Sequence, residues 1–160
     1  MTTSLGEEAY NQLRSMIVRL DFAPGDVLRE DDLRDQLGIG RTPIREALQR
    51  LEREHFVNVV ARQGIFVTGI DVGELSMLFE TRSVLEPYAA RLAALRGTNE
   101  SWEAMEEALD LTVGATNGAE LLAIDRTCHE LMWQAAGNRF LIDTLDMLYA
   151  QSDRLWHLYL

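Results

Sequence analysis

Lysine is absent from the 160-residue sequence, cysteine occurs once and proline only three times. All 15 basic residues are therefore arginine, whose planar guanidinium suits bidentate contacts to guanine and phosphate. Cys128 has no second cysteine to pair with, which favours a reducing cytoplasm. No apolar run approaches the roughly 20 residues that span a bilayer, and the start lacks the basic-then-apolar order of a signal peptide. These absences predict a cytoplasmic protein with no membrane partner.

Acidic residues outnumber arginines, and the net charge is -11. Residues 71–160 carry 6 arginines and 15 acids, a net charge of -9, whereas residues 1–70 carry 9 arginines and 11 acids, a net charge of -2. Residues 40–62 contain five arginines and three glutamates, a net charge of +2. Because the position of charge matters more than its sum, this basic island leaves a nucleic-acid partner possible.

Three helices are predicted in the first part of the chain. The first opens at a capping box that begins with Ser4, and a Pro-Gly turn over residues 23–26 ends it. The second is short, starts with three acids at 30–32 and has Gly38 as its C-cap. The third begins at a threonine–proline pair, residues 42–43, because proline at the first helical position is preset for helical φ.

Two strands follow the third helix. Residues 56–60 and 65–68 are rich in β-branched and aromatic residues, and the segment 61–64 between them contains a glycine that permits a tight hairpin. Helix, short helix, tight turn, helix and two-stranded wing is the plan of a winged helix-turn-helix. We therefore predict a DNA-binding domain of this kind over residues 1–70.

Only helices are predicted beyond residue 71. Glycine-containing breaks separate four expected helices, at about 73–96, 100–113, 118–136 and 139–160. The predicted fold class is thus mostly α. An N-terminal winged helix-turn-helix, with three helices and a two-stranded wing, is followed by an all-α helical bundle effector domain over residues 71–160.

The third helix has the residues that a DNA-reading helix needs. Its apolar residues share one face at spacings of three and four, which leaves Thr42, Arg45 and Gln49 together on the other face. Arginine can pair with guanine and glutamine with adenine, each pair being worth about 1–3 kcal/mol of discrimination. The site prediction is completed by Arg41 beside the positive helix N-terminus and by the wing-tip residues Arg62, Gln63 and Gly64. The alternative interpretation is that these polar residues only form the solvated face of an amphipathic helix and do not contact DNA.

Polar residues interrupt two apolar stripes in the second part of the chain. Asp125 and His129 lie at i and i+4 in the core-facing stripe of the helix 118–136, and Arg82 lies in that of the helix 73–96. Buried charges are costly unless they are paired, so an Asp–His pair and a salt bridge from Arg82 to Glu86 or Asp125 would be structural. One cavity lined by Arg82, Asp125 and His129 would instead bind a small carboxylate metabolite or a metal.

The first part of the chain resembles the GntR family of bacterial regulators. The resemblance rests on the motif Leu33-x3-Leu37-Gly38-x2-Arg41-Thr42-Pro43-Ile44-Arg45-Glu46-Ala47-Leu48-x2-Leu51-Glu52, with Val57 and Gly64-x-Phe66-Val67 downstream. It implies that Arg41, Thr42, Arg45 and the wing around Gly64 contact double-stranded operator DNA. Gly40 departs from the pattern, because the family usually has serine there.

The second part is similar to the FCD effector domain of the FadR-type branch of that family. The resemblance rests on Glu80-Thr81-Arg82-x3-Glu86, on Asp125-x3-His129 and on Gly137-Asn138. It implies a divalent metal ion (Zn, Ni or Mn) held by Asp125, His129 and two later histidines, with a carboxylate effector beside it. Neither His55 nor His157 matches a further ligand, so the metal site is incomplete, and we expect the chain to be a truncated form or a fragment.

The predicted function is a sequence-specific transcription regulator, a repressor as is usual in the resembled family, controlled by a small organic acid. The last helix is rich in leucine and aromatic residues, which favours a homodimer. Two alternatives are a metal-dependent enzyme that uses Asp125 and His129, and a dimerisation module without specific DNA binding. The sequence lacks Gly-x-Ser-x-Gly, His-Glu-x-x-His and a phosphate-binding glycine loop, so we predict that it is not an enzyme.

Overall fold

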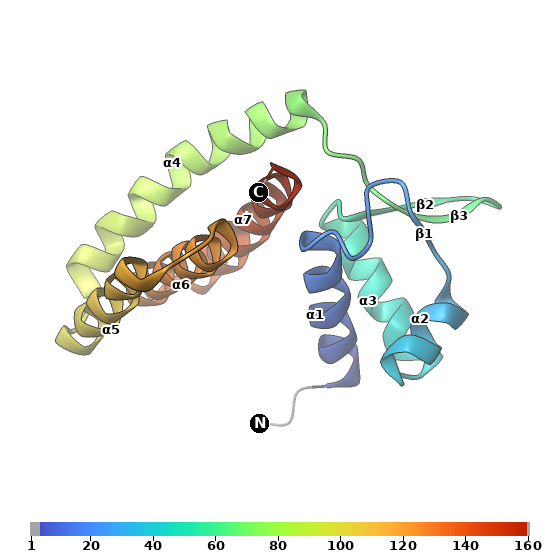
Figure 1. The fold of residues 1–160 in the computed structure, drawn as a ribbon, viewed down its shortest axis with the longest axis horizontal. Helices are drawn as coiled ribbons and strands as arrows, with labels where there is room; N and C mark the ends of the chain where they lie inside the picture. Colours follow the sequence, from blue (N-terminus) through green and yellow to red (C-terminus); the bar gives the residue numbers. More distant parts are fainter. Residues whose placement is uncertain (1–3, 160) are drawn as a thin grey trace. The chain divides into compact units, whose positions relative to one another are not determined.

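The computed structural model describes residues 4–159 and divides into two compact units, with the division between Asp71 and Val72. The first unit contains α1 (Leu5–Val18), α2 (Glu30–Leu37), α3 (Arg41–Arg53) and three short strands (Figure 1). The described part of the second unit is entirely helical. The predicted fold class, mostly α with a winged helix-turn-helix and a helical domain, is confirmed.

Local signals set the helix ends in the first unit. Ser4 caps α1 by accepting a hydrogen bond from the backbone N–H of Glu7 at 3.2 Å. Gly38 ends α2 with a φ of 67°, a left-handed conformation that glycine adopts without strain. Gly40 precedes α3 and makes no side-chain capping bond, so the first N–H groups of α3 have no cap of this kind.

The wing contains three strands where the sequence predicted two. β1 (Val27–Leu28), β2 (Val57–Val60) and β3 (Gly64–Val67), labelled in Figure 1, form an antiparallel sheet in the order β1-β3-β2. Val27 pairs with Phe66, while Asn58 pairs with Phe66 from the other side. A strand of two residues has no periodicity of its own, and only its pairing with β3 defines it.

The core of the first unit joins α1 to α3. The largest side chains that it buries completely include Leu13 and Ile17 of α1, Ile44 and Leu51 of α3, and Phe56. Each contributes about 1.5–3 kcal/mol of hydrophobic stabilisation. This packing fixes which face of α3 is turned inward.

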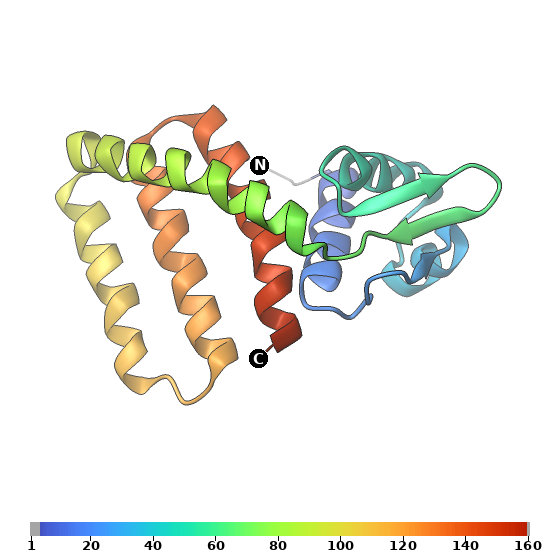
Figure 2. The same ribbon diagram turned by 90° about the horizontal axis from the view of Figure 1, so that it is seen from above.

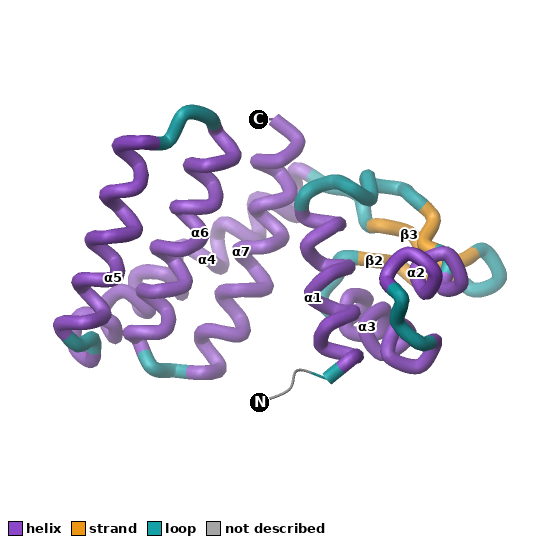
Figure 3. The backbone as a smooth tube through the Cα atoms, turned by 60° about the horizontal axis from the view of Figure 1, so that its bottom comes forward, coloured by secondary structure: helices purple, strands orange, loops and turns teal. Residues whose placement is uncertain are grey.

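The second unit consists of α4 (Val72–Arg96), α5 (Asn99–Asp110), the 3-10 helix η1 (Leu111–Gly114), α6 (Gly118–Ala136) and α7 (Arg139–Tyr159). Figures 2 and 3 show α6 between α5 and α7, with α4 packed across α6 and α7. The predicted helix 100–113 is thus a shorter α-helix that continues as a 3-10 turn.

One hydrophobic cluster joins three helices of this unit. Its buried members are Ala89, Leu92, Ala93, Trp133, Ala136, Leu141, Leu145 and Tyr149. Part of the apolar surface of α7 is therefore used inside the unit, while Trp156 and Tyr159 stay 45% and 74% exposed. The aromatic residues of the last helix thus divide between the core and the surface.

Candidate DNA-binding surface and effector site

The exposed face of α3 presents the residues predicted to read bases. Ile44, Ala47, Leu48 and Leu51 are at most 2% exposed, so the opposite face of the helix is free of the core. Thr42, Arg45 and Gln49 lie on that opposite face and are all exposed. Their orientation follows from the 3.6-residue period of the helix and from its packing against α1.

Two arginines of this surface are already paired with acids of α2. The Nε of Arg45 donates to both carboxylate oxygens of Glu30, at 2.8 and 2.9 Å. The Nη2 of Arg41 donates to the Oδ1 of Asp31 at 2.9 Å, and Arg34 donates to the same oxygen. The hydrogen bond and the positive charge of Arg41 lower the pKa of the Asp31 carboxyl. Sequence reasoning treated these acids only as favourable charges at a helix N-terminus and missed their contacts with α3.

Arg50 belongs to the basic island, but its side chain, which is 40% exposed, bonds residues of its own domain. Its Nε donates to Glu54 at 3.0 Å and its Nη1 donates to Glu7 at 3.0 Å, while Tyr10 donates to Glu54 at 2.6 Å. This network links α1 to the end of α3. Of the five arginines between residues 40 and 62, Arg50 is therefore committed to structure.

The tip of the wing carries Arg62 and Gln63, both exposed. Arg62 has a φ of 65° and Gly64 a φ of 128°, so the hairpin turns through left-handed backbone that glycine tolerates at the second position. Within the described part of the chain, Arg62 makes no ion pair. The wing therefore offers an uncompensated positive charge at its tip.

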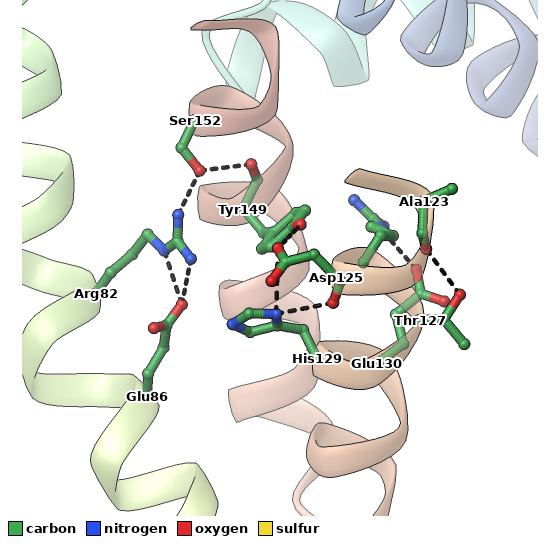
Figure 4. A network of polar contacts seen from close by, with 10 residues as sticks. Arg82, Glu86, Ala123, Asp125, Thr127, His129, Glu130, Tyr149 and Ser152 are labelled. Atoms are coloured by element: carbon green, nitrogen blue, oxygen red, sulfur yellow. Dashed lines mark hydrogen bonds and ion pairs between the residues drawn. The ribbon is translucent and has the colours of Figure 1, made fainter. Parts of the chain in front are cut away.

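Arg82 is buried. Figure 4 shows its polar contacts with Glu86 and Ser152. Its Nε donates to Glu86 at 2.8 Å, and its Nη1 donates to Ser152 of α7. Of the two acids expected as salt-bridge partners of Arg82, the one that forms the bridge is Glu86. The buried charge of Arg82 is thus balanced inside the unit, which is the structural interpretation of this residue.

The prediction that Asp125 faces the core is wrong. Its side chain is 54% exposed, whereas that of His129 is 24% exposed. The Nδ1 of His129 lies 2.9 Å from the backbone oxygen of Asp125 and 3.6 Å from its carboxylate. The buried residues of α6, Trp133 and Ala136, lie near its C-terminal end, whereas Asp125 lies in the preceding part of the helix, where no residue is buried.

Tyr149 connects the three predicted effector residues. Its hydroxyl donates to the carboxylate of Asp125, its ring centroid lies 5.1 Å from that of His129, and the guanidinium carbon of Arg82 lies 5.1 Å from the same centroid. Burial, and then the hydrogen bond to Asp125, raise the pKa of the Tyr149 hydroxyl. Sequence reasoning missed Tyr149 as a site residue, because its position 24 residues beyond Asp125 gives no local signal.

A shallow surface pocket of about 430 Å³ lies elsewhere in the unit, along α5, between residues that include Trp102 and Leu109. None of Arg82, Asp125 and His129 lines it. The predicted effector residues are therefore grouped around Tyr149 and lie apart from this pocket.

A divalent metal ion does not fit the donor set of the described residues. Asp125 and His129 supply two ligands, and residues 4–159 contain no group of three or more His, Cys, Asp and Glu side chains arranged to hold a metal. The Nε2 of His157 lies 3.9 Å from the Oδ1 of Asp153 on α7, and His157 does not form such a group with Asp125 and His129. A structural or catalytic zinc site needs at least three protein ligands, so this pair does not form one.

Every helix in the described part of the chain is too short or too polar to cross a bilayer.

Two family models match the chain. One is described as "Bacterial regulatory proteins, gntR family" and matches residues 5–67, and the other is the FCD domain, which matches residues 77–160. The chain therefore belongs to the GntR family of bacterial regulatory proteins, with an FCD domain. The family and the relatives described next are transcriptional regulators and not enzymes, which agrees with the prediction that the chain is not an enzyme.

Three curated relatives illustrate the similarity. The HTH-type transcriptional regulator YdhC of Bacillus subtilis is 30% identical over 141 residues, which are 86% of this chain and 63% of the relative. The Nta operon transcriptional regulator of Aminobacter aminovorans is 33% identical, covering 81% and 63%. A regulator from the TAR-I ttuE-ttuC' intergenic region of Agrobacterium vitis is 31% identical, covering 82% and 74%. The chain thus spans less than two thirds of the length of the first two.

Solved structures show the same fold. E. coli McbR/YncC has a TM-score of 0.81 at 23% identity, and a GntR transcriptional regulator from Rhodococcus sp. RHA1 has a TM-score of 0.69 at 24% identity. Each alignment covers 98% of this chain and 76% of the other.

Proposed function

We propose that this chain is a sequence-specific DNA-binding transcription regulator in which α3 enters the major groove of operator DNA. The observation that carries the proposal is the outward face of α3, where Thr42, Arg45 and Gln49 are exposed while the opposite face is buried against α1. Membership of the GntR family supports the same function.

Each residue of the surface has a role that fits its chemistry. Arg45 pairs with guanine and Gln49 with adenine in the major groove. Arg41 and Thr42 lie at the N-terminus of α3, where the helix dipole and free N–H groups favour a phosphate. Arg62, Gln63 and Gly64 form the wing tip, which reaches the adjacent minor groove or backbone. Phosphate contacts set the register, and base contacts set the specificity.

The second unit is proposed to sense a small carboxylate metabolite. Arg82, His129 and Asp125 surround Tyr149, and an incoming carboxylate would exchange with Glu86 on the guanidinium of Arg82. Such an exchange alters the contacts that hold α4 to α7, because Ser152 shares the same guanidinium. A ligand that binds two arrangements of these helices unequally shifts DNA affinity, and we propose that it relieves repression.

The regulator is proposed to act as a homodimer in the cytoplasm, where bacterial DNA lies. Helix-turn-helix dimers read two half-sites about one helical turn apart, so two copies of α3 are needed for a palindromic operator. Exposed apolar side chains of α7, among them Trp156 and Tyr159, are available for association.

Fluorescence anisotropy tests the DNA-reading role directly. Duplexes selected from a random pool, and the gene's own upstream region, are titrated beside scrambled duplexes at about 0.15 M salt. We expect a preference of about a thousandfold or more for the selected duplex. Arg45→Ala is expected to remove most of it, whereas Arg19→Ala, at the exposed end of α1, is expected to retain it.

Equal affinity for every duplex, unaffected by Arg45→Ala, would contradict the proposal. It would favour the alternative of a dimerisation module without specific DNA binding. Sedimentation of the chain at several concentrations then reports whether it associates at all.

A further inference from the structure

The contact between Glu30 and Arg45 distinguishes one acid of α2 from its neighbours. Glu30 engages Arg45 through both carboxylate oxygens, at 2.8 and 2.9 Å from a single donor, Nε. The Glu30 side chain is 27% exposed, while that of Arg45 is 56% exposed. Glu30 is therefore the more sheltered partner and can hold the more exposed one.

The atom that Glu30 holds matters for base reading. A guanidinium has five N–H donors in a fixed planar fork, and a bidentate contact to guanine uses two of them. Among the residues that the structure describes, no acceptor bonds Nη1 or Nη2 of Arg45. The N–H donors of Nη1 and Nη2 thus stay free to bond a base while Glu30 restrains the arginine side chain through Nε.

We infer that Glu30 is a positioning residue for sequence recognition, which restrains Arg45 in the conformation that reads the base. The inference rests on the proposed DNA-reading function of Arg45. An unrestrained arginine has many rotamers and loses that freedom on binding, so restraint before binding favours the contact that needs one geometry. The effect falls on discrimination between bases, because a misplaced guanidinium still attracts any phosphate.

The adjacent acids provide an internal comparison. Asp31 bonds Arg41 and Arg34, whereas the acid that bonds Arg45 is Glu30. Asp32 lies in the same first turn of α2 and, within residues 4–159, bonds neither Arg41 nor Arg45. A change at Asp32 therefore removes the same charge from the same helix end while leaving Arg45 held.

The test is a double-mutant cycle on the 160-residue chain. Binding is measured on the selected duplex and on duplexes changed at the one base pair whose preference Arg45→Ala removes. Glu30→Ala is expected to lower that discrimination by about three- to tenfold, the scale of fixing one long side chain. In the Arg45→Ala background, Glu30→Ala is expected to change nothing more, since the two residues act as a unit.

Asp32→Ala is the matched control and is expected to retain full discrimination at that base pair. Glu30→Gln keeps the size of the side chain and one acceptor oxygen, and is expected to give an intermediate loss even if Glu30→Ala lowers the melting temperature. Unchanged discrimination in both Glu30 variants, or an equal loss in the Arg45→Ala background, would overturn the inference. A wild-type chain that prefers no duplex would overturn the proposed function, and this inference with it.

Discussion

The guanidinium carbon of Arg50 lies 3.5 Å from the centre of the Tyr10 ring, across the interface between α3 and α1. The same arginine bonds Glu54, which also accepts the hydrogen bond of the Tyr10 hydroxyl. One charged side chain thus joins the helix that carries the proposed DNA-reading surface to the helix that supports it.

We expect Arg50→Ala to lower the free energy of unfolding by about 1–2 kcal/mol, through loss of the cation–π contact and of the bond to Glu54. Arg53→Ala, at an exposed position on the same helix, is the matched control, and an effect within about 0.5 kcal/mol is expected. Urea unfolding followed by circular dichroism measures both. Equal effects would mean that the Arg50 contacts contribute nothing beyond helix propensity.

Asp31 is expected to oppose DNA binding. Its carboxylate accepts a hydrogen bond from Arg41, which is proposed to contact phosphate. Asp31→Asn removes the negative charge, so the positive charge of Arg41 becomes available to the DNA backbone. The expected result is tighter binding to every duplex, with the slope of log affinity against log salt increasing by up to about 0.9 for the one added contact. Asp32→Asn removes the same formal charge, and we expect it to leave the slope close to that of the wild type. A steeper slope for both variants would assign the effect to net charge.

Glu86 is expected to compete with a carboxylate effector for Arg82. Replacing it by glutamine weakens the ion pair at Arg82, and we expect Glu86→Gln to bind small carboxylates about tenfold more tightly, the scale of one charge-assisted bond. Calorimetric titration with mono- and dicarboxylates from acetate to succinate measures this affinity. Glu80→Gln, on the exposed side of α4, is the control. If neither Glu86→Gln nor Arg82→Ala alters carboxylate binding, Arg82 has only a structural role.

Tyr149 is expected to make the second unit sensitive to high pH. Its pKa is raised in the folded chain by burial and by Asp125, so the unfolded chain ionises this tyrosine first, near pH 10. The contribution of the protonated Tyr149 hydroxyl to the free energy of unfolding is fully present below about pH 10. It is lost as the pH rises further, by up to about 1.4 kcal/mol per pH unit. Tyr149→Phe removes this loss, while Tyr88→Phe, at an exposed position of α4, is expected to retain it. Unfolding free energies between pH 8 and 11 distinguish the two variants.

Much of this architecture follows from local sequence. Ser4 caps α1, Gly38 ends α2 and Gly137 ends α6 because capping depends on the chemistry of one or two residues. The outward face of α3 follows from the spacing of Ile44 and Leu48, because a helix repeats every 3.6 residues whatever surrounds it. The family motif supports the function proposed for this face.

Tertiary structure decided which residues meet. The strand β1 exists only because Val27 and Leu28 pair with β3, almost 40 residues later. Asp125 is exposed because only the C-terminal part of α6, with Trp133 and Ala136, is buried, and periodicity does not tell how far along a helix the burial extends.

Tertiary structure also decided which charged side chains pair with one another. The sequence determined that Arg45 faces outward and that Arg82 lies within an apolar stripe, since both facts depend on position along one helix. Only the fold brought Glu30 to Arg45, and Ser152 and Tyr149 to Arg82, because those partners lie on other helices, 15 to 70 residues away. Hydrogen bonds act over about 3 Å, so the arrangement of helices determines which charges are paired and which remain free to bind DNA or a ligand.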